Sequence, residues 1–258
     1  MRVVFLGCTK FSEEILLHLI DQGVEVVAIL TIPEYFKINY SSEPIKNTNY
    51  SDLSKYAKQL GVPHYEVNSI EGQKMSDYHE ELEELKPDVI LTMGWYYMVG
   101  KTTRSIANHG AWGIHASLLP KYAGGAPLVW AIIKGEKETG VTLFKLDDGV
   151  DDGDIISQAK FPIAQDDTIK EVYAKATEAS KDILSETLVK GVFSFTPQDK
   201  DKIQVYPQRS PKDGKIDWNM SATEIKNFIR GQTRPYPGAY TIISGKKIII
   251  WDAEIEEL

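Results

Sequence analysis

Three largely apolar runs constrain the fold of this chain most, since each is typical of a strand that is covered on both faces. They span residues 2–6, 24–30 and 88–93 and consist largely of valine, isoleucine and leucine. Such runs are characteristic of parallel sheets. Between the first two, an amphipathic segment that opens at Ser12 and stops at Gly23 predicts a helix. The strand–helix–strand order therefore predicts an α/β fold, with helices on both faces of a mostly parallel sheet.

The remaining predicted strands and helices alternate in the same way until the last fifty residues, where the pattern of predicted elements changes. Proline and glycine cluster at Pro207, Pro211 and Gly214, so we place a domain boundary near Tyr206, between residues 1–205 and 206–258. The later region predicts a capped helix and a hairpin. Helices are predicted over 52–60, 73–85, 126–134, 168–189 and 221–230, and strands over 64–67, 140–146, 154–161, 239–243 and 247–251.

The composition narrows the class of protein. A formal net charge of −8 over 258 residues argues against a protein that grips nucleic acid through its phosphates. No apolar run approaches the roughly 20 residues of a membrane span, and the first residues lack the pattern of a secretory signal. The single cysteine, Cys8, suits a reducing cytoplasm and is expected to be a packed thiol. We therefore expect a cytoplasmic protein with neither a membrane nor a nucleic-acid partner.

Two stretches are candidates for binding a flat ligand. Residues 32–50 predict a long loop in which Tyr35 and Tyr40 can stack on a ring, with simple anchoring of the loop as the alternative. The third apolar run is followed by Gly94-Trp95-Tyr96. This stretch suits a flat ligand that lies against the backbone, with an aromatic packing cluster as the alternative. The turn at residues 7–11 lacks the glycine spacing of a dinucleotide fingerprint, so a nicotinamide or flavin cofactor is not supported. No cluster of residues has the spacing of metal ligands, and we expect no metal.

One histidine and one acidic run carry the chemistry. His115 ends an apolar run just before a sharp Leu-Leu-Pro turn, and residues 147–154 read Asp-Asp-Gly-Val-Asp-Asp-Gly-Asp after another predicted strand. At the ends of neighbouring strands, a carboxylate can fix the tautomer of the imidazole and stabilise its cationic form. Ser117 is not in the context of a nucleophile elbow. Without a nucleophile, metal or redox cofactor, the pair fits direct transfer of an activated group to an amine, and a structural histidine is the alternative.

These stretches also resemble a known family, the folate-dependent formyltransferases, which includes methionyl-tRNA formyltransferase and the sugar-nucleotide N-formyltransferases. The resemblance covers most of the chain and implies a Rossmann-like catalytic domain with a small C-terminal β-containing region, here truncated relative to a full barrel. The stretches that carry it are His115-Ala116-Ser117-Leu118-Leu119-Pro120, Glu138-Thr139-Gly140-Val141-Thr142, Asp151-Asp152-Gly153-Asp154 and Pro235-Tyr236-Pro237-Gly238-Ala239.

The resemblance implies roles for individual residues. The formyl donor would be formyl-tetrahydrofolate, with His115 as the catalytic histidine and Asp151 as its carboxylate partner. The acceptor amine would attack the formyl carbon while His115 takes its proton. The residues expected along the pterin ring are Met93, Gly94, Trp95, Tyr96, Asp147, Asp148, Gly149 and Val150. Those expected at the acceptor are Tyr35, Tyr40, Ser117, Lys121 and Tyr122, with Arg209 and Arg230 as further candidates.

Two positions depart from the family pattern. The family reads Asn-x-His, and its asparagine is expected to donate to the formyl oxygen, but here that position is Gly113. A donor of this kind can be worth about 3 kcal/mol of barrier. Thr92, Asn108 or a water in the vacated space are the candidate replacements, with an impaired enzyme as the alternative. At the second position Ala123 stands where family members often carry arginine, which weakens the case for anion binding at that turn.

The choice of acceptor depends on charge and on the C-terminal region. An acidic chain with few C-terminal strands favours a nucleotide-linked amino sugar over methionyl-tRNA. Within that class the preferred acceptor is a 4-amino-4,6-dideoxy sugar, as in pseudaminic-acid synthesis, and a homodimer is left open. A folate- or nucleotide-binding relative that has lost activity with the asparagine is the hypothesis from another class.

Overall fold

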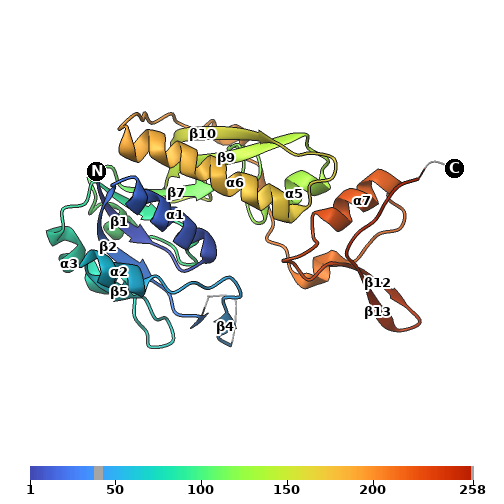
Figure 1. The fold of residues 1–258 in the computed structure, drawn as a ribbon, viewed down its shortest axis with the longest axis horizontal. Helices are drawn as coiled ribbons and strands as arrows, with labels where there is room; N and C mark the ends of the chain where they lie inside the picture. Colours follow the sequence, from blue (N-terminus) through green and yellow to red (C-terminus); the bar gives the residue numbers. More distant parts are fainter. Residues whose placement is uncertain (38–42, 257–258) are drawn as a thin grey trace.

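The computed structural model describes residues 1–37 and 43–256 and is built on one seven-stranded sheet (Figure 1). Its strand order is β10-β9-β7-β6-β1-β2-β5, in which β9 runs antiparallel to both of its neighbours and the five strands from β7 to β5 pair in parallel. The mostly parallel sheet predicted from the apolar runs is confirmed. The strands are β1 (Arg2–Leu6), β2 (Glu25–Thr31), β5 (His64–Glu66), β6 (Val89–Thr92), β7 (Ala111–His115), β9 (Glu138–Lys145) and β10 (Ile155–Pro162).

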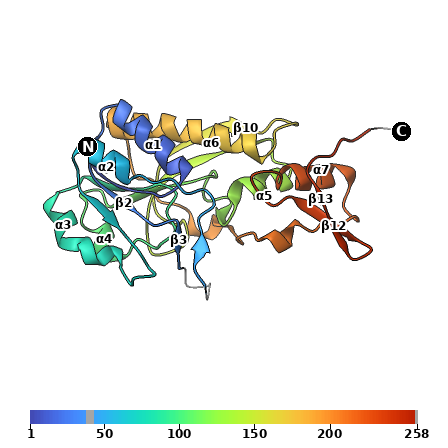
Figure 2. The ribbon, with the colours of Figure 1, turned by 60° about the horizontal axis from the view of Figure 1, so that its bottom comes forward.

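Helices cover both faces of the sheet, which explains why its strands are apolar along their whole length. One core cluster lies beneath α1, α2, α5 and α6 and includes Phe5 and Trp112, and the other lies beneath α3 and a 3-10 turn, η1, and includes Leu6 and Ile90. Figure 2 shows α1 and α6 above the sheet and α3 and α4 below it. These elements are α1 (Lys10–Asp21), α2 (Ser54–Leu60), η1 (Met75–Tyr78), α3 (His79–Glu84), α4 (Lys101–Arg104), α5 (Pro127–Ile133) and α6 (Ile169–Leu184).

Local sequence signals set the ends of the longer helices. Thr9 caps α1 and Thr168 caps α6, each in a reciprocal capping box with the residue three positions on. The segment 168–189, predicted as one helix, is α-helical only as far as Leu184, and a π-helical turn, η2 (Ser185–Val189), completes it.

The long loop predicted over 32–50 contains a short hairpin formed by β3 (Tyr35–Phe36) and β4 (Ile45–Lys46). Phe36 is fully buried there, whereas Tyr35 is half exposed. Tyr40 lies outside the described residues.

The C-terminal region forms a small body beside the end of the sheet (Figure 1). It contains a 3-10 turn, η4 (Pro211–Gly214), the capped helix α7 (Ala222–Arg230) and the predicted hairpin, β12 (Ala239–Ile243) with β13 (Lys246–Ile250). A core of Ile216, Ile229 and Ala239 holds these parts together. The segment that leads into it pairs with the catalytic region, because β11 (Val205–Tyr206) lies parallel to β8 (Ala123–Gly124). None of the helices in residues 1–37 and 43–256 has the length and apolarity that a membrane crossing requires.

Candidate active site

His115 is the last residue of β7 and only 8% of its surface is exposed. Alternation along the strand places it on the same face of the sheet as Gly113. Its Nε2 lies 2.7 Å from the carbonyl oxygen of Tyr122. Because a carbonyl oxygen can only accept, Nε2 carries a hydrogen and donates it, and the neutral ring keeps its lone pair at Nδ1.

The turn after β7 aims the Tyr122 carbonyl at this ring. Inside the turn, the Ser117 hydroxyl donates to the Lys121 carbonyl at 2.6 Å, and the Thr142 hydroxyl donates to the Ser117 carbonyl at 2.6 Å. Tyr122 has a φ of 57°, which is uncommon for a residue other than glycine. The Ser-Leu-Leu-Pro stretch is therefore a rigid frame for His115. Ser117, predicted to contact the acceptor, is fully buried and uses its hydroxyl within this frame.

Asp151 completes the pair that the sequence predicts. Its Oδ2 lies 3.3 Å from His115 Nδ1 and also accepts the backbone N–H of Gly124 at 2.8 Å. Asp151 has a φ of 51°, a left-handed conformation that aspartate tolerates better than most residues. A carboxylate oxygen and an unprotonated Nδ1 are both acceptors, so the contact becomes a hydrogen bond only when Nδ1 also carries a hydrogen. A second ring proton, such as one taken from a bound amine, would supply it.

This geometry changes one part of the sequence hypothesis. Asp151 was expected to fix the tautomer of His115, but the Tyr122 carbonyl already does so from the other side of the ring. The carboxylate is thereby left to stabilise the imidazolium or to receive a substrate N–H.

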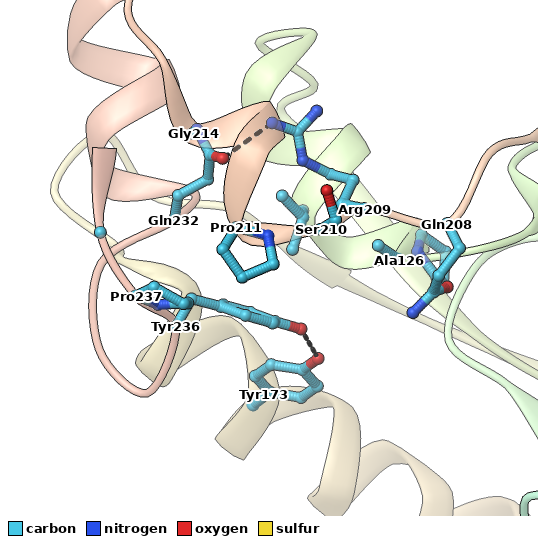
Figure 3. A pocket seen from close by; sticks show the side chains of 13 residues that line it. Ala126, Tyr173, Gln208, Arg209, Ser210, Pro211, Gly214, Gln232, Tyr236 and Pro237 are labelled. Atoms are coloured by element: carbon cyan, nitrogen blue, oxygen red, sulfur yellow. Dashed lines mark hydrogen bonds between the residues drawn. The ribbon is translucent and has the colours of Figure 1, made fainter. Parts of the chain in front are cut away.

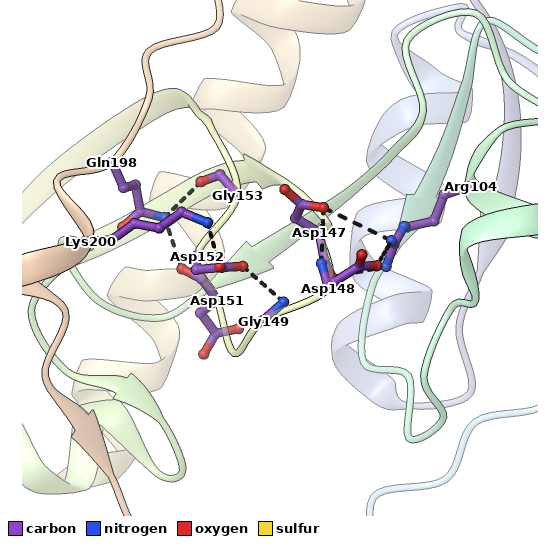
Figure 4. Close-up of polar contacts among 9 residues, drawn as sticks. All are labelled: Arg104, Asp147, Asp148, Gly149, Asp151, Asp152, Gly153, Gln198 and Lys200. Carbon is purple, nitrogen blue, oxygen red and sulfur yellow. Dashed lines mark hydrogen bonds and ion pairs between the residues drawn. The ribbon is translucent and has the colours of Figure 1, made fainter.

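The acidic loop that carries Asp151 is held at both ends by residues from distant segments (Figure 4). At the first end, Arg104 donates to the Asp147 carbonyl at 2.8 Å and pairs with the Asp148 carboxylate. At the second end, the Gln198 amide donates to the carbonyls of Asp151 and Gly153 at 2.8 and 2.7 Å. Sequence reasoning missed both anchors, since a lone arginine at the end of the short helix α4 and a lone glutamine in a loop give no motif.

Close packing explains the glycines of the same loop. A Cβ on Gly153 would lie 1.8 Å from the carbonyl oxygen of Lys145, and one on Gly149 would lie 2.4 Å from the Asp152 carboxylate. Asp152 accepts the Gly149 N–H at 3.1 Å and pairs with Lys200 at 3.0 Å. The Asp-x-Gly-Asp pattern therefore encodes the shape of the loop as well as its charge.

The strand end predicted to face the cofactor is partly occupied by the protein itself. Met93 is 1% exposed, lies in the core beneath α1, and accepts the Ser12 hydroxyl with its carbonyl at 2.5 Å. Gly94 has a φ of 61°, and a Cβ there would lie 2.2 Å from Thr9 Oγ1. The glycine is thus required by the start of α1. Of these two residues, Gly94 is partly exposed and Met93 is not.

The aromatic residues that follow offer a surface that fits a pterin. Tyr96 is 45% exposed, stacks at 4.8 Å on the buried ring of Phe36, and donates its hydroxyl to Asn47. The indole N–H of Trp95 is buried and has no hydrogen-bond partner in the described part of the chain. Unpaired buried donors are rare in native proteins, and an acceptor atom of a bound ligand would satisfy this one. Val150, on the acidic loop, is 54% exposed. The aromatic packing cluster foreseen as one alternative is therefore present, and the ligand surface stays a prediction.

The space beside Gly113 is filled by side chains rather than by a water-sized gap. A Cβ on Gly113 would lie 3.1 Å from Leu146 Cδ2 and 3.7 Å from the Phe144 ring. Asn108 is wrong as a replacement donor, because it lies before the amino end of β7 and donates to Asp88. Thr92 remains, and its hydroxyl is buried without a hydrogen-bond partner in the described residues.

The residues predicted at the acceptor are spread around the site. Lys121 is exposed, and Tyr35 is 50% exposed with the Lys46 ammonium 5.6 Å from its ring centre. The Tyr122 side chain points away from His115 and donates to Glu136 at 2.7 Å. Arg230 is wrong as a ligand contact, because it is buried and donates to the carbonyls of the segment before α6.

Arg209, the other predicted arginine, lines a pocket of about 250 Å³ between α5, α6 and the C-terminal region (Figure 3). Its guanidinium lies 4.6 Å from the Trp130 ring and donates to Gln232 at 2.7 Å. Across the pocket the hydroxyls of Tyr173 and Tyr236 are 2.5 Å apart. Since one hydrogen lies between them, the pair has a second hydroxyl hydrogen to offer. The pocket therefore presents donors from both sides.

Two sequence predictions concern groups outside this chemistry. Cys8 is fully buried, and burial raises the pKa of its thiol to about 12, so the packed thiol is confirmed. In residues 1–37 and 43–256, no three or more histidine, cysteine or acidic side chains lie together in a way that would hold a metal ion.

The chain matches known protein families over most of its length. Residues 1–188 match the family described as formyl transferase, and residues 209–258 match the formyl transferase C-terminal domain. The chain is 35% identical over 260 residues to methionyl-tRNA formyltransferase of Caldanaerobacter subterraneus subsp. tengcongensis, covering 100% of this chain and 82% of that protein. It is 37% identical over 258 residues to the bifunctional polymyxin resistance protein ArnA of Wigglesworthia glossinidia brevipalpis, covering 99% of this chain but 38% of that protein.

The fold is also shared with a solved structure. The N-formyltransferase from Helicobacter canadensis, in complex with folinic acid and dTDP-3-aminofucose, superposes with a TM-score of 0.71 at 21% identity, covering 96% of this chain and 86% of that one. The Rossmann-like fold with a small C-terminal β region, which the sequence resemblance implies, is thereby confirmed. With both family domains matched along one chain, this protein belongs to the formyltransferase family.

Proposed function

We propose that this protein transfers a formyl group from formyl-tetrahydrofolate to the amine of a nucleotide-linked amino sugar. The observation that carries this proposal is the pairing of His115 Nδ1 with Asp151 Oδ2 at 3.3 Å. Two facing acceptors form a receptor for an amine that must lose a proton. The net charge of −8 disfavours a polyanionic acceptor. The preferred acceptor is a 4-amino-4,6-dideoxy sugar, as in pseudaminic-acid and related glycan synthesis.

In the proposed reaction, His115 holds one hydrogen on Nε2, where Tyr122 accepts it, and receives the amine proton on Nδ1. The resulting imidazolium is stabilised by Asp151, which the Gly124 N–H keeps in place. The folate supplies the activated formyl group when it is bound. Burial of His115 keeps bulk water from competing for the same proton.

We place the pterin ring between the backbone of Met93 and Gly94 and the first half of the acidic loop. Tyr96 and Val150 offer exposed apolar surface there, and the unpaired Trp95 N–H offers a donor. These features support a flat, acceptor-bearing ring. The relative from Helicobacter canadensis was solved with folinic acid, which supports the same class of ligand.

We place the nucleotide of the acceptor near Lys121 and Arg209. Lys121 is exposed beside the His115 turn, and Arg209 faces a pocket in which the Tyr173 and Tyr236 hydroxyls offer a further donor. A donor-rich surface is complementary to phosphate and carbonyl oxygens. The domain boundary near Tyr206 would then lie beside this pocket, and we retain it as part of the proposal.

The deciding experiment is formyl transfer with purified protein, formyl-tetrahydrofolate and a panel of acceptors, followed by mass spectrometry of the products. The panel contains nucleotide-linked 3-amino and 4-amino sugars and initiator methionyl-tRNA. Formylation of an amino sugar alone is expected. Formylation of the tRNA alone would replace this proposal with the second candidate, which the 35% identity to a methionyl-tRNA formyltransferase favours. Folate binding without transfer to any acceptor would favour the inactive binding relative.

We also propose a homodimer through the C-terminal hairpin. Its strands β12 and β13 form a two-stranded sheet that is joined to the preceding segment by a single bridge between Tyr240 and Lys215, and a two-stranded hairpin is marginally stable in water. Four of its isoleucines are 41–56% exposed: Ile242, Ile243, Ile248 and Ile249. Light scattering after gel filtration should give twice the chain mass for the wild type and a shift toward monomer for Ile243→Glu. A monomeric wild type would reject the dimer.

A further inference from the structure

The hydroxyl of Thr92 is the feature of the site that the proposed function leaves unexplained. Its Oγ1 is shielded from solvent and makes no hydrogen bond within the described residues. Threonine hydroxyls buried in strands normally find a partner, as Thr142 does within β9 of the same sheet. An unpaired hydroxyl that native packing retains is therefore a candidate to bind a ligand atom.

Thr92 lies next to the position where the expected donor is missing. In the parallel pair of β6 and β7, Thr92 stands opposite Gly113. Paired residues of neighbouring strands project to the same face of a sheet, and His115, two residues beyond Gly113, projects there too. Thr92, the vacant position and the catalytic histidine thus form one row at the carboxyl ends of two strands.

The other sources of a donor are closed off. Beside Gly113 the position of the missing Cβ is flanked by the Leu146 side chain at 3.1 Å and the Phe144 ring at 3.7 Å, and the polar atom among its nearest neighbours is the Thr92 carbonyl oxygen at 3.7 Å, which accepts and cannot donate. Asn108 is engaged with Asp88 before the amino end of the strand. The backbone N–H of Thr92 belongs to a strand that is paired on both sides, by β1 and by β7.

We propose that Thr92 Oγ1 donates the hydrogen bond that stabilises the formyl oxygen as it becomes negative, in place of the asparagine that this chain lacks at Gly113. This inference rests on the proposed function and deepens it. The donor has moved from β7 to the adjacent strand, and the glycine makes room for Leu146.

The step balances as follows. The amine nitrogen bonds to the formyl carbon, and the π electron pair of the carbonyl moves onto its oxygen, which accepts the Thr92 hydrogen. When the carbonyl reforms, the bond from the formyl carbon to the folate nitrogen breaks and its electron pair leaves with that nitrogen. The proton that His115 took from the amine is returned to the leaving nitrogen. The products are a formamide and tetrahydrofolate, with no net change at Thr92 or His115.

The test is Thr92→Val, which keeps the shape and removes the hydroxyl. We expect kcat for formyl transfer to fall about 100-fold, the range seen when a single donor to a developing oxyanion is removed. The melting temperature of the ligand-free variant should rise, because an unpaired buried polar group is lost. Thr92→Ser should retain most of the activity.

A matched control is Thr187→Val, far along the chain in η2. The Thr187 hydroxyl is also buried but donates to the Ile183 carbonyl at 2.7 Å. This variant should therefore lower the melting temperature and leave kcat within twofold of the wild type, the opposite of the expected signature at Thr92.

A rescue experiment separates this inference from the proposed function. Gly113→Asn and Leu146→Ala are added together to Thr92→Val, because Leu146→Ala removes the side chain 3.1 Å from the new Cβ. The combined variant should have a kcat at least tenfold above that of Thr92→Val alone. A Thr92→Val variant with wild-type kcat would overturn the role of Thr92 but leave formyl transfer intact. If the wild type is inactive and Gly113→Asn/Leu146→Ala is active, Thr92 supplies no donor and the inference fails. If neither is active with any acceptor, the proposed function fails as well.

Discussion

The two halves of the acidic loop look alike in sequence but are held differently by the fold. In the second half the side chains of Asp151 and Asp152 are 22% and 17% exposed, whereas those of Asp147 and Asp148 in the first half are 59% and 74% exposed. One pair is packed against His115, Gln198 and backbone amides, and the other is tethered by one arginine. Each half carries two adjacent aspartates followed by a glycine. The residues packed around each carboxylate therefore decide which one can take part in the reaction.

The largest expected effect separates these carboxylates by activity. Asp151→Asn keeps the side-chain shape and tolerates the left-handed backbone, but it removes the charge that stabilises the imidazolium. We expect kcat of this variant to fall by a factor of about 10²–10⁴, the range of acid–base catalysis. The kcat of His115→Ala should fall at least as far. Steady-state kinetics with an unchanged melting temperature is the measurement.

The matched substitution in the first half is Asp148→Asn, for which we expect a loss below tenfold. Equal losses in the two variants would break the distinction between the halves. Full activity in both Asp151→Asn and His115→Ala would remove the pair from the mechanism.

The second expected effect concerns stability and tests how tightly the second half is packed. In Gly153→Ala the new Cβ would lie 1.8 Å from the Lys145 carbonyl oxygen, which is backbone and cannot move freely. We expect the free energy of unfolding to fall by about 3 kcal/mol, the upper end for overpacking.

Gly100→Ala is the control, because nothing lies within 4 Å of its Cβ and its φ is not left-handed. Urea denaturation should show a loss below about 1 kcal/mol there. If Gly153→Ala is as stable as Gly100→Ala, the second half of the loop is not fixed by close packing.

The third effect addresses the tether of the first half. Arg104 is 11% exposed and donates to the Asp147 carbonyl and the Asp148 carboxylate. We expect Arg104→Ala to raise KM for the formyl donor about tenfold, equivalent to about 1.4 kcal/mol, with a smaller change in kcat.

Lys200→Ala provides the comparison on the other half. Lys200 is 68% exposed in its pair with Asp152, and exposed pairs contribute about 0–1 kcal/mol. We expect its KM to change by less than twofold. A larger effect from Lys200 than from Arg104 would invert the picture of one loosely tethered half and one packed half.

Sequence reasoning reached the sheet and the proximity of His115 and Asp151 because both follow from strong local signals. Apolar runs identify strands that are buried on both faces, and His115 ends one of the parallel strands, whereas Asp151 lies in the loop between the antiparallel strands β9 and β10. The capping box at Ser221 placed the start of α7, whereas α1 begins at Lys10, two residues before the predicted Ser12.

The parts it missed depend on contacts between distant segments. Gln198 reaches Asp151 across 47 positions and Arg104 reaches Asp148 across 44, and neither belongs to a pattern with a known period. Gly94 was interpreted as a ligand surface because the approach of Thr9, from another strand end, is invisible in the sequence. The packing of Leu146 beside Gly113 is likewise a contact that the sequence does not reveal.

The smallest expected effect is a change in titration at the exposed end of the loop. The Arg104 guanidinium, through its hydrogen bond and its charge, lowers the pKa of the Asp148 carboxyl. A lowered pKa favours the carboxylate in the folded state, so the contact persists above the ordinary carboxyl range and is lost as the pH falls through the lowered pKa. In Arg104→Ala the Asp148 pKa should rise toward that of an exposed aspartate. NMR of the Asp148 carboxyl carbon through an acid titration measures the difference. If the two proteins titrate alike, Arg104 does not hold the first half of the loop in solution, and the KM effect predicted for its removal loses its physical basis.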